Sequence, residues 1–127
     1  MDTRKKILER IEDVPEALRS NTDNLIVISG YFDVLTPALV ARIRDISGKH
    51  PDCPILALVL EMDGALLPQR ARAELAASLA TIRYVLIVKT VAAALEALTP
   101  TLVVRDEENQ LADRRLLIRH VQKRYQD

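Results

Sequence analysis

The stretch Leu25-Ile26-Val27-Ile28-Ser29-Gly30-Tyr31-Phe32-Asp33-Val34-Leu35-Thr36-Pro37 decides the fold class of this 127-residue chain. Its first four residues form a continuous apolar run rich in β-branched side chains, which is typical of a strand buried on both faces. Thr36 is suited to cap a helix and Pro37 fits the first helical position, so a helix is expected to begin there. The stretch therefore predicts a buried strand that turns directly into a helix.

The rest of the chain repeats this alternation of strand and helix. Strands are expected at residues 25–28, 55–60, 84–88 and 101–104, and helices at residues 3–19, 37–47, 68–80, 91–98 and 112–125. Because each strand is apolar throughout, the sequence predicts an α/β fold, a Rossmann-like three-layer α/β/α sandwich with a parallel sheet, in a single domain spanning residues 1–127.

The expected topology also predicts where a ligand would bind. Ligands of such sheets lie beyond the carboxyl ends of the strands, where the strand order reverses. We expect strand 25–28 to be central, which puts residues 30–39 at that point. The last helix is expected to turn its apolar positions toward the sheet, namely Leu116, Leu117, His120 and Val121.

Composition excludes several classes of protein. Eighteen basic residues balance eighteen acidic ones, which argues against a general nucleic-acid binder. The longest apolar runs are strand-sized, so no membrane segment is expected and a cytoplasmic location is the default. Cys53 is the only cysteine, and His50 and His120 are the only histidines, so we expect neither a disulfide framework nor a metal site.

Several short motifs resemble those of one enzyme family. Gly30, Phe32 and Asp33 match a Gly-x-Phe-Asp motif that follows a buried strand, although residues 36–39 read Thr-Pro-Ala-Leu where that family has His-x-Gly-His. Residues 72–75 resemble its Arg-x-Glu helix, and residues 94–104 resemble the approach to its next strand. Over roughly residues 25–105 the chain resembles the cytidylyltransferase-like nucleotidyltransferases, of the type found in glycerol-3-phosphate cytidylyltransferase and the adenylyltransferase domain of ADP-heptose synthase.

The resemblance implies a nucleotide site with a degenerate catalytic motif. Members transfer a nucleotidyl group from CTP or ATP, with Mg²⁺, to a phosphorylated small molecule, and their two histidines donate hydrogen bonds to the phosphates. Here Thr36 offers one hydroxyl at the first histidine position and Leu39 offers no donor at the second, so no catalytic residue is assigned. The nucleotide-contacting positions carried over from the family, or close to its phosphate site, are Gly30, Tyr31, Phe32, Asp33, Thr36, Ala38, Asp63, Arg105 and Arg114.

Three hypotheses follow for the function. The leading one is a catalytically degenerate nucleotidyltransferase-like protein, a pseudoenzyme with residual nucleotide binding. The second is an active, divergent nucleotidyltransferase that uses Thr36, Arg105 and Arg114 in place of the missing groups. The third is a partner-binding or dimerisation module with no nucleotide, and the resemblance makes a homodimer one candidate assembly.

For several of these residues, the sequence allows a structural role as well as a functional one. Thr36 is either a helix cap or a phosphate contact, and Phe32 is either a core residue or part of the site. Asp33 either caps the backbone of its own turn or meets magnesium. Arg114 or Arg115 is expected near the start of the last helix, where a guanidinium and a helix amino end attract anions.

Overall fold

A computed structural model describes residues 2–16 and 24–126 and shows a five-stranded, all-parallel sheet of the Rossmann-like α/β class. The spatial order of the strands is β1-β4-β3-β2-β5. Their bounds are Ile7–Leu8 for β1, Ile26–Gly30 for β2, Ile55–Leu60 for β3, Tyr84–Val88 for β4 and Leu102–Arg105 for β5. The predicted strands are therefore confirmed, β3 and β4 to the residue, and the two-residue β1 is an addition.

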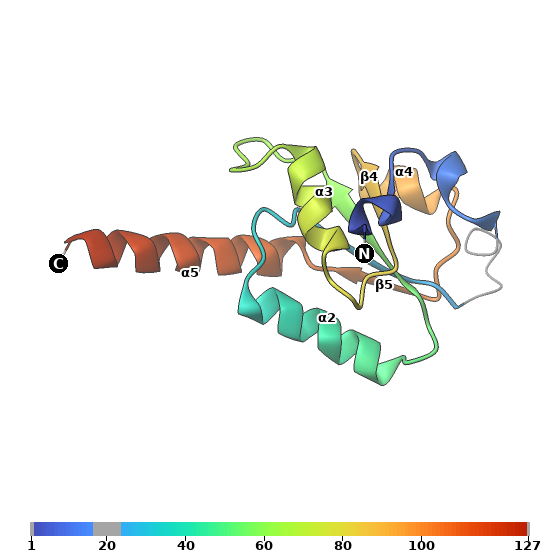
Figure 1. Cartoon of the computed structure of the whole chain (residues 1–127), viewed down its shortest axis with the longest axis horizontal. Helices are drawn as coiled ribbons and strands as arrows, with labels where there is room; N and C mark the ends of the chain where they lie inside the picture. The colour runs from blue at the N-terminus through green and yellow to red at the C-terminus, as the bar shows by residue number, and fades with distance from the viewer. Residues whose placement is uncertain (1, 17–23, 127) are drawn as a thin grey trace.

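Four α-helices and two short 3₁₀ turns accompany the described strands, with η1 before the first strand and α5 after the last (Figure 1). The helices are α2 (Pro37–Lys49), α3 (Gln69–Ala77), α4 (Val91–Leu95) and α5 (Glu107–Gln126), and the 3₁₀ turns are η1 (Thr3–Lys6) and η2 (Ile11–Asp13). The start of α2 is as predicted, because the Thr36 hydroxyl accepts a hydrogen bond from the Leu39 N–H at 3.2 Å and Pro37 occupies the first turn.

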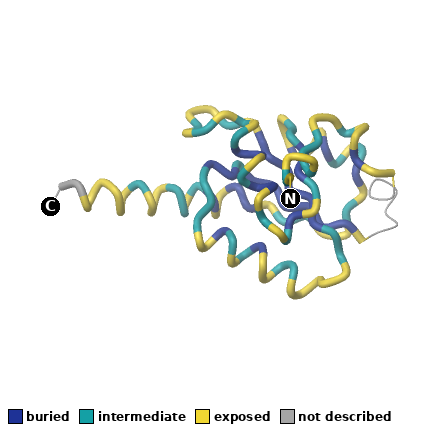
Figure 2. The backbone as a smooth tube through the Cα atoms, viewed as in Figure 1, coloured by how far each residue is buried: buried dark blue, intermediate teal, exposed yellow. Residues whose placement is uncertain are grey.

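The strands β2, β3 and β4 are buried or half-buried throughout, as their apolar residues require (Figure 2). In the edge strand β5, Leu102 and Arg105 are exposed. On one face α2 and α3 pack against alternate strand residues such as Ile28 and Ala57. On the other face, α4 and the segment around η2 cover the strand residues that point the opposite way, such as Val27 and Leu56. This alternation follows from the period of two along a strand, and it makes the sheet the middle of three layers.

The amino-terminal prediction is wrong over the described residues. Residues 3–16 do not form one amphipathic helix, and residues 17–19 of that expected helix lie outside the described part of the chain. Instead Ile7 and Leu8 pair with Val85 and Leu86 of β4 and extend the sheet by one strand. The Lys6 ammonium donates to the carbonyls of Leu79 and Ile82, which ties the segment to the end of α3. Pairing with a free sheet edge outweighs helical periodicity here.

The prediction for the last helix is wrong in two respects. The helix α5 begins at Glu107, five residues earlier than expected, because Glu107 and Glu108 in the first turn favour a helix amino end. Its apolar residues do not face the sheet: Leu116, Leu117 and Val121 are 64%, 41% and 45% exposed. Figure 1 shows why, since α5 leaves the body and projects outward, and Figure 2 shows the projecting part largely exposed.

The topology puts a switch point beside β2. The strands β3 and β4 lie on one side of β2, and β5, which follows β4 in the chain, lies on the other side, so the strand order reverses beside β2. The middle strand of the five is β3, but the reversal falls between β2 and β5, as expected for residues 30–39. Among the described residues, no helix has the length and apolarity to cross a bilayer.

Candidate functional site

The candidate site is the crevice at the carboxyl end of β2, where α5 begins. The crevice is lined by residues of the turn after β2, the start of α2, the loop after β3 and the first turns of α5: Tyr31, Asp33, Val34, Thr36, Leu39, Met62, Gln110, Leu111, Asp113 and Arg114. The free space between these side chains is only about 10 Å³. A cavity of that size holds about one water molecule. The crevice is therefore formed, but its own side chains fill it.

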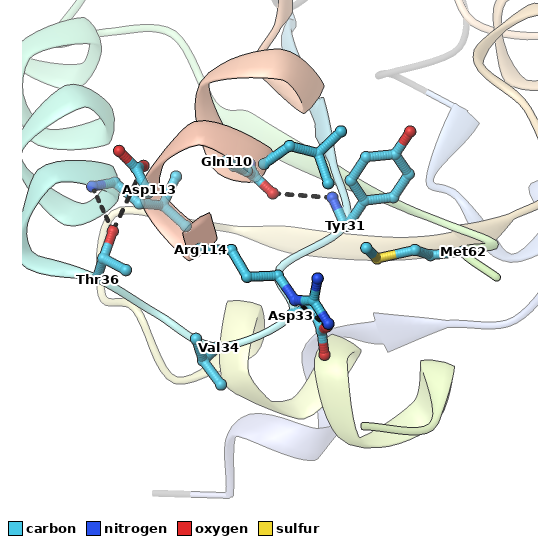
Figure 3. A pocket seen from close by; sticks show the side chains of 10 residues that line it. Tyr31, Asp33, Val34, Thr36, Met62, Gln110, Asp113 and Arg114 are labelled. Carbon is cyan, nitrogen blue, oxygen red and sulfur yellow. Dashed lines mark hydrogen bonds and ion pairs between the residues drawn. The ribbon is translucent and has the colours of Figure 1, made fainter. Parts of the chain in front are cut away.

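The side chain of Gln110 occupies the position where strand β2 ends. Its carboxamide oxygen accepts from the backbone N–H of Tyr31 at 2.8 Å (Figure 3). The same oxygen accepts from the Phe32 N–H at 2.8 Å, and the carboxamide nitrogen donates to Asp106 at 3.1 Å. Adjacent N–H groups after a strand are the donors that phosphate-binding turns present to a ligand. Here one side chain of the same chain satisfies both donors.

An ion-pair cluster holds Gln110 in this orientation. The guanidinium of Arg42 on α2 makes two hydrogen bonds to Asp106, at 3.0 and 2.9 Å, and one to Asp113 at 2.8 Å. The hydrogen bonds to Asp106 and, to a smaller extent, the one to Asp113 raise the pKa of Arg42 above its ordinary value, although partial burial opposes this shift. Bidentate pairs of this kind fix geometry as well as charge. They clamp α5 to α2 and, through Asp106, orient the Gln110 carboxamide.

Asp33 caps a neighbouring loop rather than its own turn. Its two carboxylate oxygens accept from the backbone N–H groups of Leu66 and Leu67, at 2.8 and 3.0 Å. The Arg114 Nε lies 3.1 Å from the same carboxylate but without hydrogen-bond alignment, so this contact is a charge pair (Figure 3). A magnesium ion does not fit these residues, because both oxygens are engaged and a guanidinium already lies against one.

Arg72 on α3 hydrogen-bonds to backbone carbonyls beside the crevice. Its guanidinium donates to the carbonyls of Tyr31 and Leu60, both at 2.8 Å, and of Leu67 at 3.1 Å. The residue is 2% exposed, and burial lowers the pKa of Arg72 while the nearby Asp33 charge opposes that shift. One buried cation thus joins the ends of β2 and β3 to the loop before α3.

The turn after β2 is conformationally strained. Phe32 has a φ of +52° and Val34 a φ of +80°, in the left-handed region that side chains disfavour, a β-branched one such as Val34 above all. The aromatic ring of Phe32 is fully buried in the core between the sheet and α2, which is the position of a core residue. The hydrogen bonds that Gln110 and Arg72 make to this turn keep it in its strained conformation.

The structure brings together some of the positions taken from the resemblance and separates others. Five line the crevice: Tyr31, Asp33, Thr36, Leu39 and Arg114. Gly30 and Phe32 are buried beneath it. The other three lie outside it: Ala38 is exposed on α2, Asp63 lines a neighbouring groove, and the Arg105 side chain is 61% exposed and pairs with Glu107. Arg114 belongs to the third turn of α5, so neither it nor Arg115 stands at the helix amino end.

Gln110, Asp113 and Arg42 are the site residues that the sequence analysis missed. Gln110 lay between the expected strand at residues 101–104 and the expected helix at residues 112–125, Asp113 lay at the start of that helix, and Arg42 stood on an ordinary amphipathic helix. A usable signal was present in Asp106-Glu107-Glu108, since acidic residues at that spacing before a helix mark its amino end. Starting the helix there would have put Gln110 and Asp113 on one face, three residues apart.

Gly30→Ala is expected to lower the free energy of unfolding by about 2 kcal/mol, because a Cβ at this position would overlap the Gln110 carboxamide and displace it from its backbone partners. Urea unfolding of the purified variant measures this. The double variant Gly30→Ala, Gln110→Ala is the control. Because Gln110→Ala removes the overlapping carboxamide, it should lower the free energy of unfolding less in the Gly30→Ala background than in the wild type. Additive costs would contradict the assignment.

Comparison with known proteins finds no protein-family model that matches this sequence and no curated protein with significant similarity to it. Within residues 2–16 and 24–126, no three His, Cys, Asp or Glu side chains gather as ligands for a metal ion. The geometry of the crevice, and of the helix that fills it, is therefore the basis for assigning a function.

Proposed function

We propose that this chain is a partner-binding domain of nucleotidyltransferase-like design, in which internal hydrogen bonds occupy the switch-point crevice in place of a nucleotide. The observation that carries the proposal is the Gln110 carboxamide, which accepts from both Tyr31 N–H and Phe32 N–H. A phosphate group would compete for the same two donors. Opening the crevice would break the contacts of Gln110 and leave buried N–H groups unpaired, which costs about 1–3 kcal/mol for each group.

The engagement of the other polar groups supports the same proposal. Catalysis of nucleotidyl transfer depends on donors that are preorganised toward the phosphates. The Thr36 hydroxyl caps α2 and lies 3.5 Å from Asp113, and Arg114 is held between Asp33 and the Gly64 carbonyl. Arg105 pairs with Glu107 outside the crevice. Each donor named for an active, divergent enzyme is thus committed to a contact within the domain.

The projecting part of α5 supports the partner-binding side of the proposal. A helix that exposes Leu116, Leu117 and Val121 gains nothing from those side chains in the isolated domain. Apolar residues gathered on an exposed helix face are typical of a surface that another macromolecule covers. The same helix fills the crevice with its first turns, so one element accounts for both features.

Calorimetric titration of the protein with CTP, and separately with ATP, each with Mg²⁺ at low salt, is expected to give no heat of binding and no thermal shift up to millimolar nucleotide. The reason is that a nucleotide has about 10 Å³ to enter and must displace Gln110. A dissociation constant at or below about 100 µM, which corresponds to about 5.5 kcal/mol, would contradict the proposal. Repeating the titration with Gln110→Glu, which puts a carboxylate at the same N–H groups, would locate any such binding: loss of the heat assigns it to the crevice.

A further inference from the structure

The helix α5 leaves the domain between two other segments. Its third turn contacts the loop after β3, where Arg114 Nη2 donates to the Gly64 carbonyl at 3.2 Å, and it contacts the start of α2, where Asp113 lies 3.5 Å from the Thr36 hydroxyl. Beyond these contacts residues 115–124 are exposed apart from the half-buried Ile118. Figure 1 shows the same arrangement, with α5 emerging between the loop and α2 and continuing past both.

The face of α5 that packs on the domain continues past its edge as an apolar face. Gln110, Asp113 and Arg114 face the crevice, and residues three, four, seven and eight positions further lie on the same side of a helix. Those positions bring Leu117 and Val121 into line, at 41% and 45% exposure. Leu116, at 64% exposure, lies instead on the side of Arg119 and Lys123, three and seven residues further along the helix. The opposite face carries the basic residues Arg115, Arg119 and Lys123. The outer half of α5 is therefore amphipathic.

Charge is segregated between this helix and the rest of the chain. Residues 114–126 contain five of the eighteen basic residues and none of the eighteen acidic ones, so the remainder of the chain is acidic although the whole is neutral. In the described part of the chain, no ion pair involves Arg115, Arg119, Lys123 or Arg124. The net positive charge of residues 114–126 is thus equal in size and opposite in sign to the net negative charge of the rest of the chain.

A groove of suitable character lies next to the root of α5. The groove, which we call the β3–α3 groove, has a volume of about 590 Å³ and is lined by residues of the loop after β3 and the start of α3: Glu61, Met62, Asp63, Gly64, Ala65, Leu66, Leu67, Pro68, Gln69 and Arg72. It combines apolar side chains, including Leu66 at 59% exposure, with the exposed carboxylates Glu61 and Asp63. These are the features that complement an apolar helix face flanked by cations.

We propose that the occupant of the β3–α3 groove is the outer half of α5 from a second copy of this chain, in a two-fold symmetric pair. Leu117 and Val121 of one copy pack on Leu66 and its neighbours in the other, and Arg124 approaches Glu61 or Asp63. The inference deepens the proposed partner-binding function and rests on it. Helix and groove lie side by side at one end of the molecule, so a single two-fold rotation fills both grooves and closes the assembly.

The helix has the reach that such a pairing needs. Residues 115–126 span about 18 Å at 1.5 Å per residue, which is enough to cross an adjacent loop of the partner. A pairing along the whole length of two α5 helices is disfavoured, because it would put the five cations of one helix against those of the other. Docking each helix on the acidic body of the other copy avoids that repulsion.

Sedimentation equilibrium of the full chain tests the proposal. The wild type is expected at twice the chain mass of 14.3 kDa, and Val121→Glu is expected to weaken the pairing by about 30-fold or more, the effect of a hot-spot residue at an interface. Gln122→Glu is the matched control. It adds the same charge one residue along on the other side of an exposed helix and is expected to leave the pairing unchanged.

A charge exchange tests which surfaces meet. Arg124→Glu and Asp63→Lys are each expected to weaken self-association. An equimolar mixture of the two variants is expected to pair better than either alone, because both interfaces of a mixed pair then bring opposite charges together. Both positions are exposed, so folding is unaffected. Absence of any recovery in the mixture would overturn the assignment of the β3–α3 groove.

Other results overturn the second copy as the occupant. A wild type that sediments at the single-chain mass at about 200 µM would do so, as would a Val121→Glu variant that pairs like the wild type. Binding of a monomeric wild type to phosphatidylserine vesicles, lost in Val121→Glu, would assign α5 to a lipid surface instead. None of these results depends on nucleotide, so they leave the calorimetric test of the proposed function independent.

Discussion

Arg72→Met is expected to lower the free energy of unfolding by about 3–5 kcal/mol, because it leaves one buried and two part-buried backbone carbonyls without this donor. The guanidinium of Arg72 reaches Tyr31 O, Leu60 O and Leu67 O, and each belongs to a different segment of the chain. Burial already lowers the pKa of Arg72, and the three hydrogen bonds to carbonyl oxygens are what stabilise the charge there. Methionine keeps much of the volume and supplies none of the donors.

Urea unfolding followed by circular dichroism measures this loss, with Arg70→Met as the control. Arg70 lies two residues earlier on α3, its side chain is 46% exposed, and it makes surface ion pairs with Glu9 and Glu74. Such pairs contribute about 1 kcal/mol or less. If the two substitutions cost the same, the role assigned to Arg72 as the buried link between three segments is wrong.

Phe32→Ala is expected to cost about 3–5 kcal/mol, because it removes a fully buried aromatic ring and leaves a cavity between the sheet and α2. The backbone at this position has a φ of +52°, which strains phenylalanine and alanine alike, so the difference reports the side chain. The prediction separates a core role for Phe32 from a role in contacting a nucleotide. A ligand contact could be lost with little change in stability.

Phe32→Leu provides the graded comparison for this site. Leucine fills much of the same volume, so its cost should be near 1 kcal/mol and well below that of alanine. Urea midpoints of the wild type and both variants give the series. Equal and small costs for the two variants would show that the ring does not hold the β2 turn in place.

Most of the sheet could be predicted because strand signals in this chain are strong and local. The β3 and β4 strands are uninterrupted apolar runs bounded by turns, and the whole of each is buried or half-buried in the structure. The amino-terminal segment could not be predicted in the same way. Ile7 and Leu8 suit a helix face and a strand equally well, and the free edge of β4 that selects the strand is far away in the sequence.

The position of the candidate site could be predicted, but the residues that fill it could not. The Gly-Tyr-Phe-Asp segment pointed to the switch point, and the structure puts it there. What fills the crevice depends on Gln110, which is 80 residues from Gly30 in the sequence and meets it only after the sheet has formed. A resemblance of motifs carries no information on such a contact, because the same glycine leaves room equally for a ligand or for a carboxamide.

The projecting half of α5 gives the molecule a segment whose helical order receives little support from its own domain. A helix of about twelve residues without tertiary contacts is marginal in water, whereas the first turns of α5 are clamped to α2 through Arg42. Cooperative unfolding of the domain and fraying of the outer helix are therefore separate events. Whatever docks there must also offset the conformational entropy that the segment loses. The affinity of α5 for its partner therefore depends on the intrinsic helicity of its projecting half as much as on the side chains in contact.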